Sequence, residues 1–163
     1  MENNLSGTLA IDIGNTNTVI AFQDQKDTNS VLVEIPNITS SPGVIPTAVW
    51  FEPSKTIKIG ISALKMRNNS NSDIFFHSNF KRLIGNPIEK IKQKKFLNPS
   101  ESGEKFFKFL WANIPKEYEI KRLVLTAPID TYKGYREWLV NLCKECCVDE
   151  IALVDEPTAA SLG

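Results

Sequence analysis

The segment Leu9–Phe22, with the sequence LAIDIGNTNTVIAF, constrains the fold more than any other part of the chain. Two apolar runs flank a Gly-Asn-Thr-Asn turn. This pattern predicts two antiparallel strands joined by a tight hairpin, because glycine and asparagine tolerate the positive φ angles that such turns use. The chain is therefore expected to open with a sheet hairpin.

The same hairpin carries polar groups suited to a phosphate and a metal ion. Asp12 ends the first strand, where a carboxylate can hold a hydrated Mg²⁺ ion, and burying an aspartate in an apolar run is costly unless it is used. The turn offers backbone N–H groups and polar side chains to a phosphate. The turn residues are Gly14, Asn15, Thr16 and Asn17. The GxxxxGK[ST] spacing of a P-loop is missing, and an ordinary surface hairpin is the alternative.

Composition narrows the class of protein. The chain has 163 residues, enough for one compact domain, and its 42% hydrophobic and 23% charged residues are globular values. Lys plus Arg equals Asp plus Glu at 19 each, so no net field attracts nucleic acid or an anionic membrane. The N-terminal sequence does not match a signal peptide, and no apolar run approaches the ~20 residues of a membrane span. We expect a cytoplasmic protein without nucleic-acid or membrane partners.

The cysteines and the single histidine are expected to be structural. Cys143, Cys146 and Cys147 include a Cys-x-x-Cys spacing, which is typical of redox or metal sites. However, Trp138, Leu139 and Leu142 continue the same helical spacing, so the cysteines are predicted to be small apolar residues of a helix face. His77 has no ligand pattern around it and is predicted on a helix surface.

Hydrophobic periodicity predicts the remaining elements. Strands are expected at Thr8–Ile13, Thr18–Gln23, Ser30–Ile35, Thr47–Phe51, Thr56–Ile59, Arg122–Ala127 and Ile151–Val154. Helices are expected at Ile61–Arg67, Phe75–Leu83, Ser102–Ile114 and Tyr132–Cys147, and one more from Pro157. Parallel strands joined by helices predict an α/β layer that includes the opening hairpin. The interval at about residues 36–98 is predicted to be a small inserted subdomain.

Three separated pieces together resemble a known family: Ile11–Ala21 (IDIGNTNTVIA), Phe80–Gly85 (FKRLIG) and Arg122–Gly163, which contains DEPTAASLG. They resemble the ATPase domain of the seventy-kilodalton heat-shock (DnaK-like) chaperones, within the actin and sugar-kinase superfamily. The resemblance implies a ribonuclease H-like, actin-like ATPase fold: an α/β mixed sheet with flanking helices. It runs from about Leu9 to Gly163 and covers the first lobe of that two-lobed domain. The second lobe and the peptide-binding domain would lie beyond it.

The resemblance also implies roles for individual residues. Asp12 would orient the Mg²⁺–water shell, and Gly14, Asn15, Thr16 and Asn17 would form the first phosphate loop. Lys81 and Glu156 would be catalytic: Lys81 would reach the terminal phosphate and position the attacking water, and Glu156 would lie near the metal shell. Pro128 and Arg136 would form the interdomain switch. The implied cofactors are ATP and Mg²⁺, and the implied partners of a complete protein are unfolded polypeptide clients and co-chaperones.

The chain departs from the family pattern at several places. Asn15-Thr16 stands where the family has two adjacent threonines, and no aromatic residue closely follows Pro128. In the family the second phosphate loop lies beyond the position of Gly163. The 163-residue chain alone is therefore expected to bind nucleotide weakly and to hydrolyse little, since catalysis needs the nucleotide clamped from both sides.

Two alternatives follow from the same residues. The stretch IDIGNTNTV also looks like the opening of type III pantothenate kinases, which would phosphorylate pantothenate. The third possibility is a degenerate, non-catalytic fragment. In either a fragment or a lone lobe, the exposed lobe interface would favour self-association.

Overall fold

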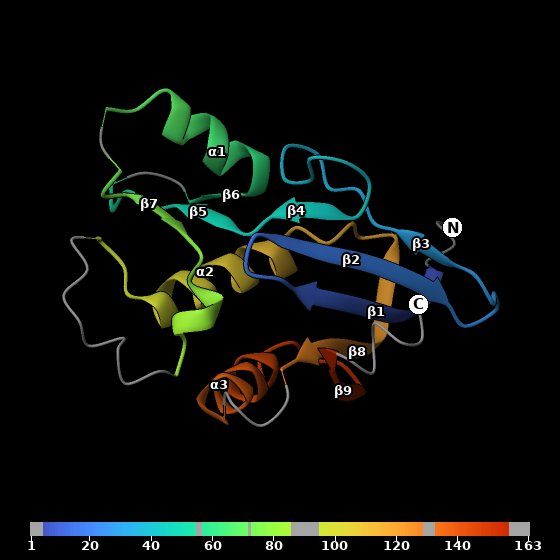
Figure 1. Ribbon diagram of the computed structural model, residues 1–163. Helices are drawn as coiled ribbons and strands as arrows, with labels where there is room; N and C mark the ends of the chain where they lie inside the picture. Colours follow the sequence, from blue (N-terminus) through green and yellow to red (C-terminus); the bar gives the residue numbers. More distant parts are fainter. Residues whose placement is uncertain (1–4, 55–56, 72, 86–94, 129–132, 157–163) are drawn as a thin grey trace.

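The computed structural model describes residues 5–54, 57–71, 73–85, 95–128 and 133–156. Within these ranges a six-stranded sheet and a three-stranded sheet are present (Figure 1). The strands of the large sheet are Leu5–Ile13 (β1), Asn17–Asp24 (β2), Ser30–Leu32 (β3), Val44–Pro46 (β4), Tyr118–Ala127 (β8) and Glu150–Asp155 (β9). Their order is β3-β2-β1-β8-β9, and β4 pairs with β2 outside this order.

The large sheet is mixed, as predicted. β1 and β2 pair antiparallel up to Ile13 opposite Thr18, which confirms the predicted hairpin. β1 pairs parallel with β8, and β8 pairs parallel with β9. Two helices precede and follow β8: Pro99–Ala112 (α2) and Lys133–Cys143 (α3). The α/β class is therefore confirmed, and the carboxyl ends of β1, β8 and β9 lie at one edge of the sheet.

The two faces of the large sheet differ. Leu9 of β1 belongs to the same buried cluster as Phe107 of α2 and Leu139 of α3, so this face packs on the helices. Side chains alternate across a strand, so the next residues point to the other face. That second face contains a shallow apolar hollow of about 190 Å³. The residues lining it are Ala10, Ile11, Asp12, Val19, Ala21, Val124, Thr126 and Val154.

The smaller sheet has its own helix and core. It has the strand order β6-β5-β7 and is antiparallel throughout. Its elements are Ala48–Trp50 (β5), Lys58–Ile59 (β6), Phe76–Ser78 (β7) and the helix Gly60–Asn68 (α1). Trp50, Ala63 and Phe76 form a separate buried cluster between them. α2 contacts this sheet as well, so one helix supports both sheets.

The predicted helix at Phe75–Leu83 is wrong. This segment forms β7, then a left-handed residue, Asn79 (φ 56°), and then a short 3₁₀ helix at Lys81–Leu83 (η1). Phe76 and Phe80 are both buried, so their four-residue spacing resembles a helix although the two side chains come from different elements. The prediction for His77 is wrong for the same reason, because it lies in a buried strand, with 4% of its surface exposed.

Other boundaries also differ from the expectation. α2 begins earlier, at Pro99, because Asn98 and Glu101 form a capping box. α3 ends at Cys143, and Cys147 beyond it adopts φ 51°. Cys143 and Cys146 are buried in the core as predicted, whereas Cys147 is exposed. The helix expected from Pro157 lies outside the described residues.

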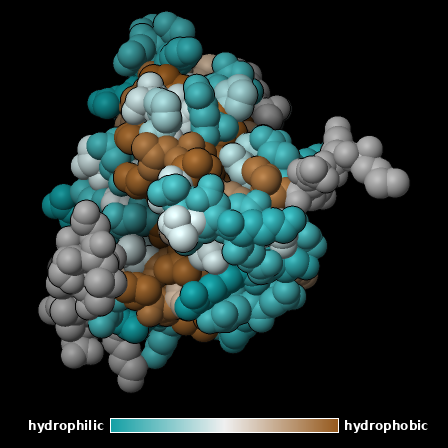
Figure 2. Space-filling model, turned by 90° about the vertical axis from the view of Figure 1, so that its right-hand side faces the viewer, coloured by the Kyte–Doolittle hydropathy of each residue, from teal (hydrophilic) through white to brown (hydrophobic). Residues whose placement is uncertain are grey.

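Exposed apolar side chains occur on several strands, among them Val19, Val31 and Leu32. Figure 2 views the molecule from the right-hand side of Figure 1 and shows hydrophobic patches separated by hydrophilic surface. Within the described part of the chain, no helix has the length and hydropathy that crossing a bilayer requires.

Candidate functional site

One cavity lies at the edge of the large sheet where the carboxyl ends of β1, β8 and β9 meet. In open α/β sheets this edge is the usual place for a ligand. The cavity has a volume of about 420 Å³, within the range of ~300–1,000 Å³ typical of small-molecule sites. Eight residues line it: Asp12, Gly14, Asn15, Lys81, Arg82, Pro128, Tyr135 and Glu156.

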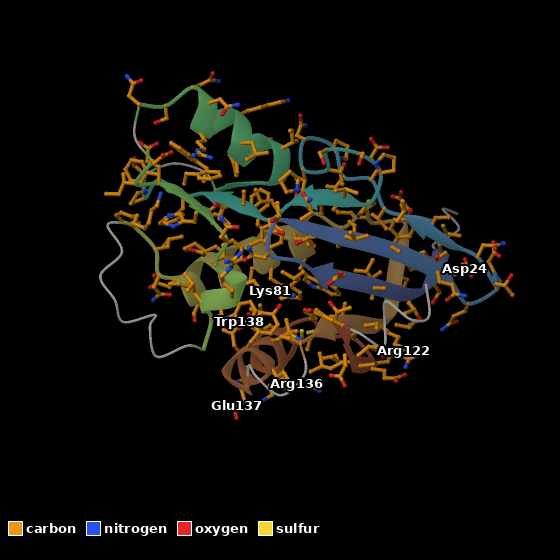
Figure 3. The ribbon with its side chains drawn as sticks, viewed as in Figure 1. Asp24, Lys81, Arg122, Arg136, Glu137 and Trp138 are labelled. Atoms are coloured by element: carbon orange, nitrogen blue, oxygen red, sulfur yellow. The ribbon has the colours of Figure 1, made fainter. Side chains whose placement is uncertain are left out.

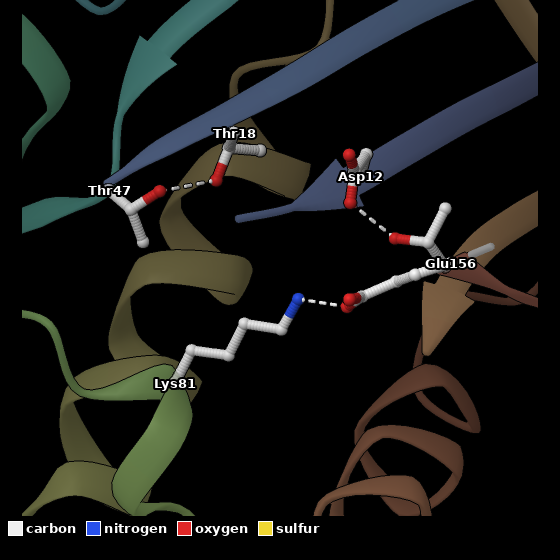
Figure 4. Close-up of polar contacts among 6 residues, drawn as sticks. Asp12, Thr18, Thr47, Lys81 and Glu156 are labelled. Atoms are coloured by element: carbon white, nitrogen blue, oxygen red, sulfur yellow. Dashed lines mark hydrogen bonds and ion pairs between the residues drawn. The ribbon is translucent and has the colours of Figure 1, made fainter. Parts of the chain in front are cut away.

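The β1–β2 turn forms one wall of the cavity. Gly14 donates its backbone N–H to the Asp12 carbonyl oxygen at 3.1 Å. The expected positive φ is not found at the turn residues. Glycine is needed for a different reason, because a Cβ at position 14 would lie 2.1 Å from the Asn17 carbonyl oxygen. The base of the turn is fixed by a buried hydroxyl pair, Thr18 and Thr47, whose oxygens are 2.9 Å apart (Figure 4).

Asp12 lies on the face of β1 that points away from the helices. Its side chain is exposed rather than buried, so the expectation of a costly buried carboxylate is corrected. The hydroxyl of Thr126, on the neighbouring strand β8, donates a hydrogen bond to Asp12 Oδ1. The carboxylate is thus held at the cavity wall and remains open to water or a ligand.

Lys81 reaches into the cavity from the 3₁₀ helix and meets Glu156 (Figure 4). Lys81 Nζ lies 2.5 Å from Glu156 Oε1, and the two side chains are 12% and 40% exposed. The 3₁₀ segment is placed by a close approach of two glycines, because a Cβ on Gly85 (φ 73°) would lie 2.6 Å from the Gly134 Cα at the start of α3. Lys81 Nζ also lies 5.4 Å from the ring centroid of Tyr135.

Asn15 connects the turn to the segment that carries Lys81. Asn15 Nδ2 donates to Asn79 Oδ1 at 2.9 Å. Arg82 Nε donates to Asn15 Oδ1 at 3.4 Å, a long hydrogen bond. Asn15, which stands where the resembled family has a threonine, therefore holds Arg82 beside the β1–β2 turn.

The sequence-predicted site residues are only partly brought together. Asp12, Gly14, Asn15, Lys81, Pro128 and Glu156 line the cavity. Thr16 and Asn17 are exposed and lie outside this lining, and Thr16 accepts the Thr47 N–H through its backbone carbonyl. Arg136 Nη1 lies 2.5 Å from Asp155 Oδ1, one residue before Glu156.

Three residues near the cavity were missed by sequence reasoning: Arg82, Thr126 and Tyr135. Arg82 had a signal, since it follows Lys81 in the quoted box, but adjacent lysine and arginine usually mark a solvated face. Tyr135 is four residues before Leu139, a spacing that predicts burial on a helix. No sequence pattern places its ring under the Lys81 ammonium.

The donor set of the cavity fits a magnesium ion that is shared with phosphate. Within the described residues, no cluster of three or more histidine, cysteine, aspartate and glutamate side chains could hold a metal ion. Two carboxylates, Asp12 and Glu156, line the cavity together with two cations. Mg²⁺ binds through one or two carboxylates, waters and substrate phosphates, so this set suits it without a complete protein cage.

Comparisons with known proteins point to one group. No protein-family model matches the chain. The chain is 29% identical over 157 residues to the chaperone protein DnaK of Metamycoplasma hominis. It is 34% identical over 159 residues to the chaperone protein DnaK of Thermosipho melanesiensis. Each match covers 95% of this chain and 25% of the DnaK protein. The chain is thus similar to a portion of DnaK chaperones, and it spans about a quarter of the length of these curated relatives.

Proposed function

We propose that this chain is the first nucleotide-binding lobe of a DnaK-like chaperone and that its cavity binds ATP with Mg²⁺. The observation that carries the proposal is the convergence of Lys81, Asp12 and Glu156 on one cavity beside the β1–β2 turn. These groups come from segments far apart in the sequence. A cation, two carboxylates and a glycine turn together suit a polyphosphate with its metal ion. The similarity to DnaK along nearly the whole chain supports this choice.

Each residue has a separate task in this proposal. The Lys81 ammonium pairs with a phosphate oxygen and complements the charge that spreads over the phosphate during transfer. Asp12, oriented by the hydrogen bond from Thr126, would hold the metal ion through its carboxylate. Glu156, which pairs with Lys81 in the structure, would be the second carboxylate available to hold the metal ion and its waters. A bound Mg²⁺ ion supplies positive charge to the phosphate oxygens.

The remaining proposals concern the complete protein. We place the chain in the ribonuclease H-like class, with residues 36–98 as an inserted subdomain and a second lobe closing on the nucleotide. ATP hydrolysis would then drive the binding and release of unfolded polypeptides, with co-chaperones as partners, in the cytoplasm. Pro128 lines the cavity and Arg136 pairs with Asp155, so both could pass nucleotide state onward.

The test is calorimetric titration of the full-length protein with ATP and Mg²⁺. Asp12→Asn and Lys81→Met should each weaken binding ~10-fold or more, because each removes a charged contact. Asp24→Asn is the matched control, since Asp24 lies at the far end of β2 from Lys81 in Figure 3. Unchanged binding in the Asp12 and Lys81 variants would contradict the proposed site. The rival kinase function would be established by pantothenate-dependent formation of ADP.

A further inference from the structure

The Tyr135 hydroxyl is buried without a partner. Tyr135 is 1% exposed, and within the described part of the chain its hydroxyl oxygen has no hydrogen-bond partner. Buried polar atoms are nearly always paired, so an unpaired one calls for an explanation. Among the described residues, two other buried side-chain atoms have no hydrogen-bond partner, Trp50 Nε1 and His77 Nε2, but both belong to the smaller sheet. Tyr135 is the one of the three that lines the candidate cavity.

The position of the Tyr135 ring is fixed by its surroundings. The ring belongs to the main buried cluster and packs against Trp138, with ring centroids 5.4 Å apart. Trp138 in turn lies close to α2, because a Cβ on Gly103 would come within 2.8 Å of its ring. On the other side, Lys81 Nζ is 5.4 Å from the Tyr135 ring centroid. The tyrosine is therefore part of the rigid core and not a mobile surface group.

The electrostatic surroundings make the Tyr135 hydroxyl a donor. Burial, and then the negative charges of Glu156 and Asp12, raise the pKa of Tyr135 above its ordinary value. The phenol therefore keeps its proton at neutral pH and can donate it. Glu156 is already engaged by Lys81, and Asp12 by Thr126. An acceptor that enters the cavity would satisfy the hydroxyl.

We propose that Tyr135 is a further binding residue of the cavity, whose hydroxyl donates a hydrogen bond to a phosphate oxygen of the ligand beside Lys81. This inference rests on the proposed function, because it takes the ligand to be a polyphosphate. The ring provides a second contribution by holding the Lys81 ammonium through its π face. The hydroxyl has no hydrogen-bond partner among the described residues, so it is free to donate a hydrogen bond to the ligand.

The test compares Tyr135→Phe with Tyr118→Phe in the full-length protein. Both changes remove one phenolic oxygen, and Tyr118 packs against Phe22 at a ring-centroid distance of 4.4 Å, outside the cavity lining. The probes are Mg²⁺-ATP, Mg²⁺-tripolyphosphate and adenosine. Tyr135→Phe should weaken the binding of the two phosphate ligands ~10-fold, since a hydrogen bond to a charged acceptor is lost. The affinity for adenosine should not change. Tyr118→Phe should bind all three ligands like the unchanged protein.

Thermal unfolding without ligand provides the second measurement. If the hydroxyl is unpaired in the fold, Tyr135→Phe should melt at the same temperature as the unchanged protein or higher. A lower melting temperature would mean that the hydroxyl is bonded within the protein, and this would overturn the inference. Equal ATP binding by Tyr135→Phe and the unchanged protein would also overturn it, while the proposed function would stand. Failure of the unchanged protein to bind either phosphate ligand would overturn both.

Discussion

The protonation of His77 is determined by its buried position in β7. It pairs with Val49 across β7 and β5, and its Nε2 has no partner among the described residues. Burial, and then the positive charge of Lys95, lowers the pKa of His77 to about 4 from its ordinary value of 6.5. The imidazole therefore stays neutral in the folded protein at pH values at which an unfolded chain would bind a proton.

This depressed pKa predicts a loss of stability in acid. Between pH 6.5 and about 4 the unfolded chain binds more protons at His77 than the folded chain does. The free energy of unfolding should therefore fall as the pH falls through this range, by on the order of 3 kcal/mol in total. The measurement is urea unfolding from pH 7.5 to 4. His77→Gln should flatten the profile, and an identical slope in both proteins would contradict the prediction.

Some residues of the candidate site could be predicted from the sequence, and others could not. Asp12, Lys81 and Glu156 were predicted because each belongs to a short box that resembles a known family. The structure places all three on one cavity. Tyr135 was not predicted, because its role depends on how Gly85 approaches Gly134, a contact between segments distant in sequence. The reason for Gly14 was likewise invisible, since it is a clash with the Asn17 carbonyl rather than a φ requirement.

The 3₁₀ segment and α3 are coupled through the Gly85–Gly134 contact. Gly85 has φ 73°, and a side chain there would meet the backbone of Gly134. A side chain at position 85 would therefore be strained by the left-handed φ and would clash with Gly134, and both effects would push the segment that carries Lys81 away from α3. The Lys81 ammonium would then leave its place near the Tyr135 ring and the Glu156 carboxylate.

Gly85→Ala should therefore weaken ATP binding by the folded protein, in addition to lowering the free energy of unfolding. Gly43→Ala is the matched control, because Gly43 also has a left-handed φ, 71°, and a Cβ there would meet Leu32 far from the cavity lining. Each variant should lose ~1 kcal/mol or more of unfolding free energy. Only Gly85→Ala should reduce the ATP affinity of the folded protein, by ~10-fold. Equal affinities of the two variants, measured by titration well below their melting temperatures, would contradict the prediction.

The elements themselves were predictable where one periodicity dominates. The β1–β2 hairpin and α2 follow from alternating runs and from a four-residue apolar spacing. The prediction was wrong at residues 75–83, where two aromatic residues four apart belong to a strand and to the start of a 3₁₀ helix. A left-handed residue at Asn79 separates them, and single-sequence periodicity does not register such a break.

The chain as a whole carries helices on one face of its large sheet and an apolar hollow on the other. The hollow is lined largely by small and β-branched side chains, including Ala21 and Val124. In the proposed complete protein, additional residues of the same polypeptide would pack against this face. In the 163-residue chain taken alone we expect this face to favour contact with another copy.

Self-association of the 163-residue chain is therefore expected to depend on this face. Light scattering at increasing concentration should show growth in mean mass for the unchanged chain. Ala21→Lys places a charge in the hollow and should shift the chain toward the monomer. Thr28→Lys, an exposed position outside the hollow, should behave like the unchanged chain. A monomer at every concentration would contradict the expectation.

The cavity holds an anion of its own, because the Glu156 carboxylate sits on the Lys81 ammonium. Under the proposed function, an arriving phosphate would have to displace this tethered carboxylate from Lys81. The pair lowers the cost of keeping a largely buried ammonium, and a bound anion would have to compete with Glu156 for Lys81. Such an exchange would free Glu156, the residue that follows β9, from a segment 75 residues earlier in the chain. Binding of phosphate would in this way break a contact between two segments that are distant in the sequence.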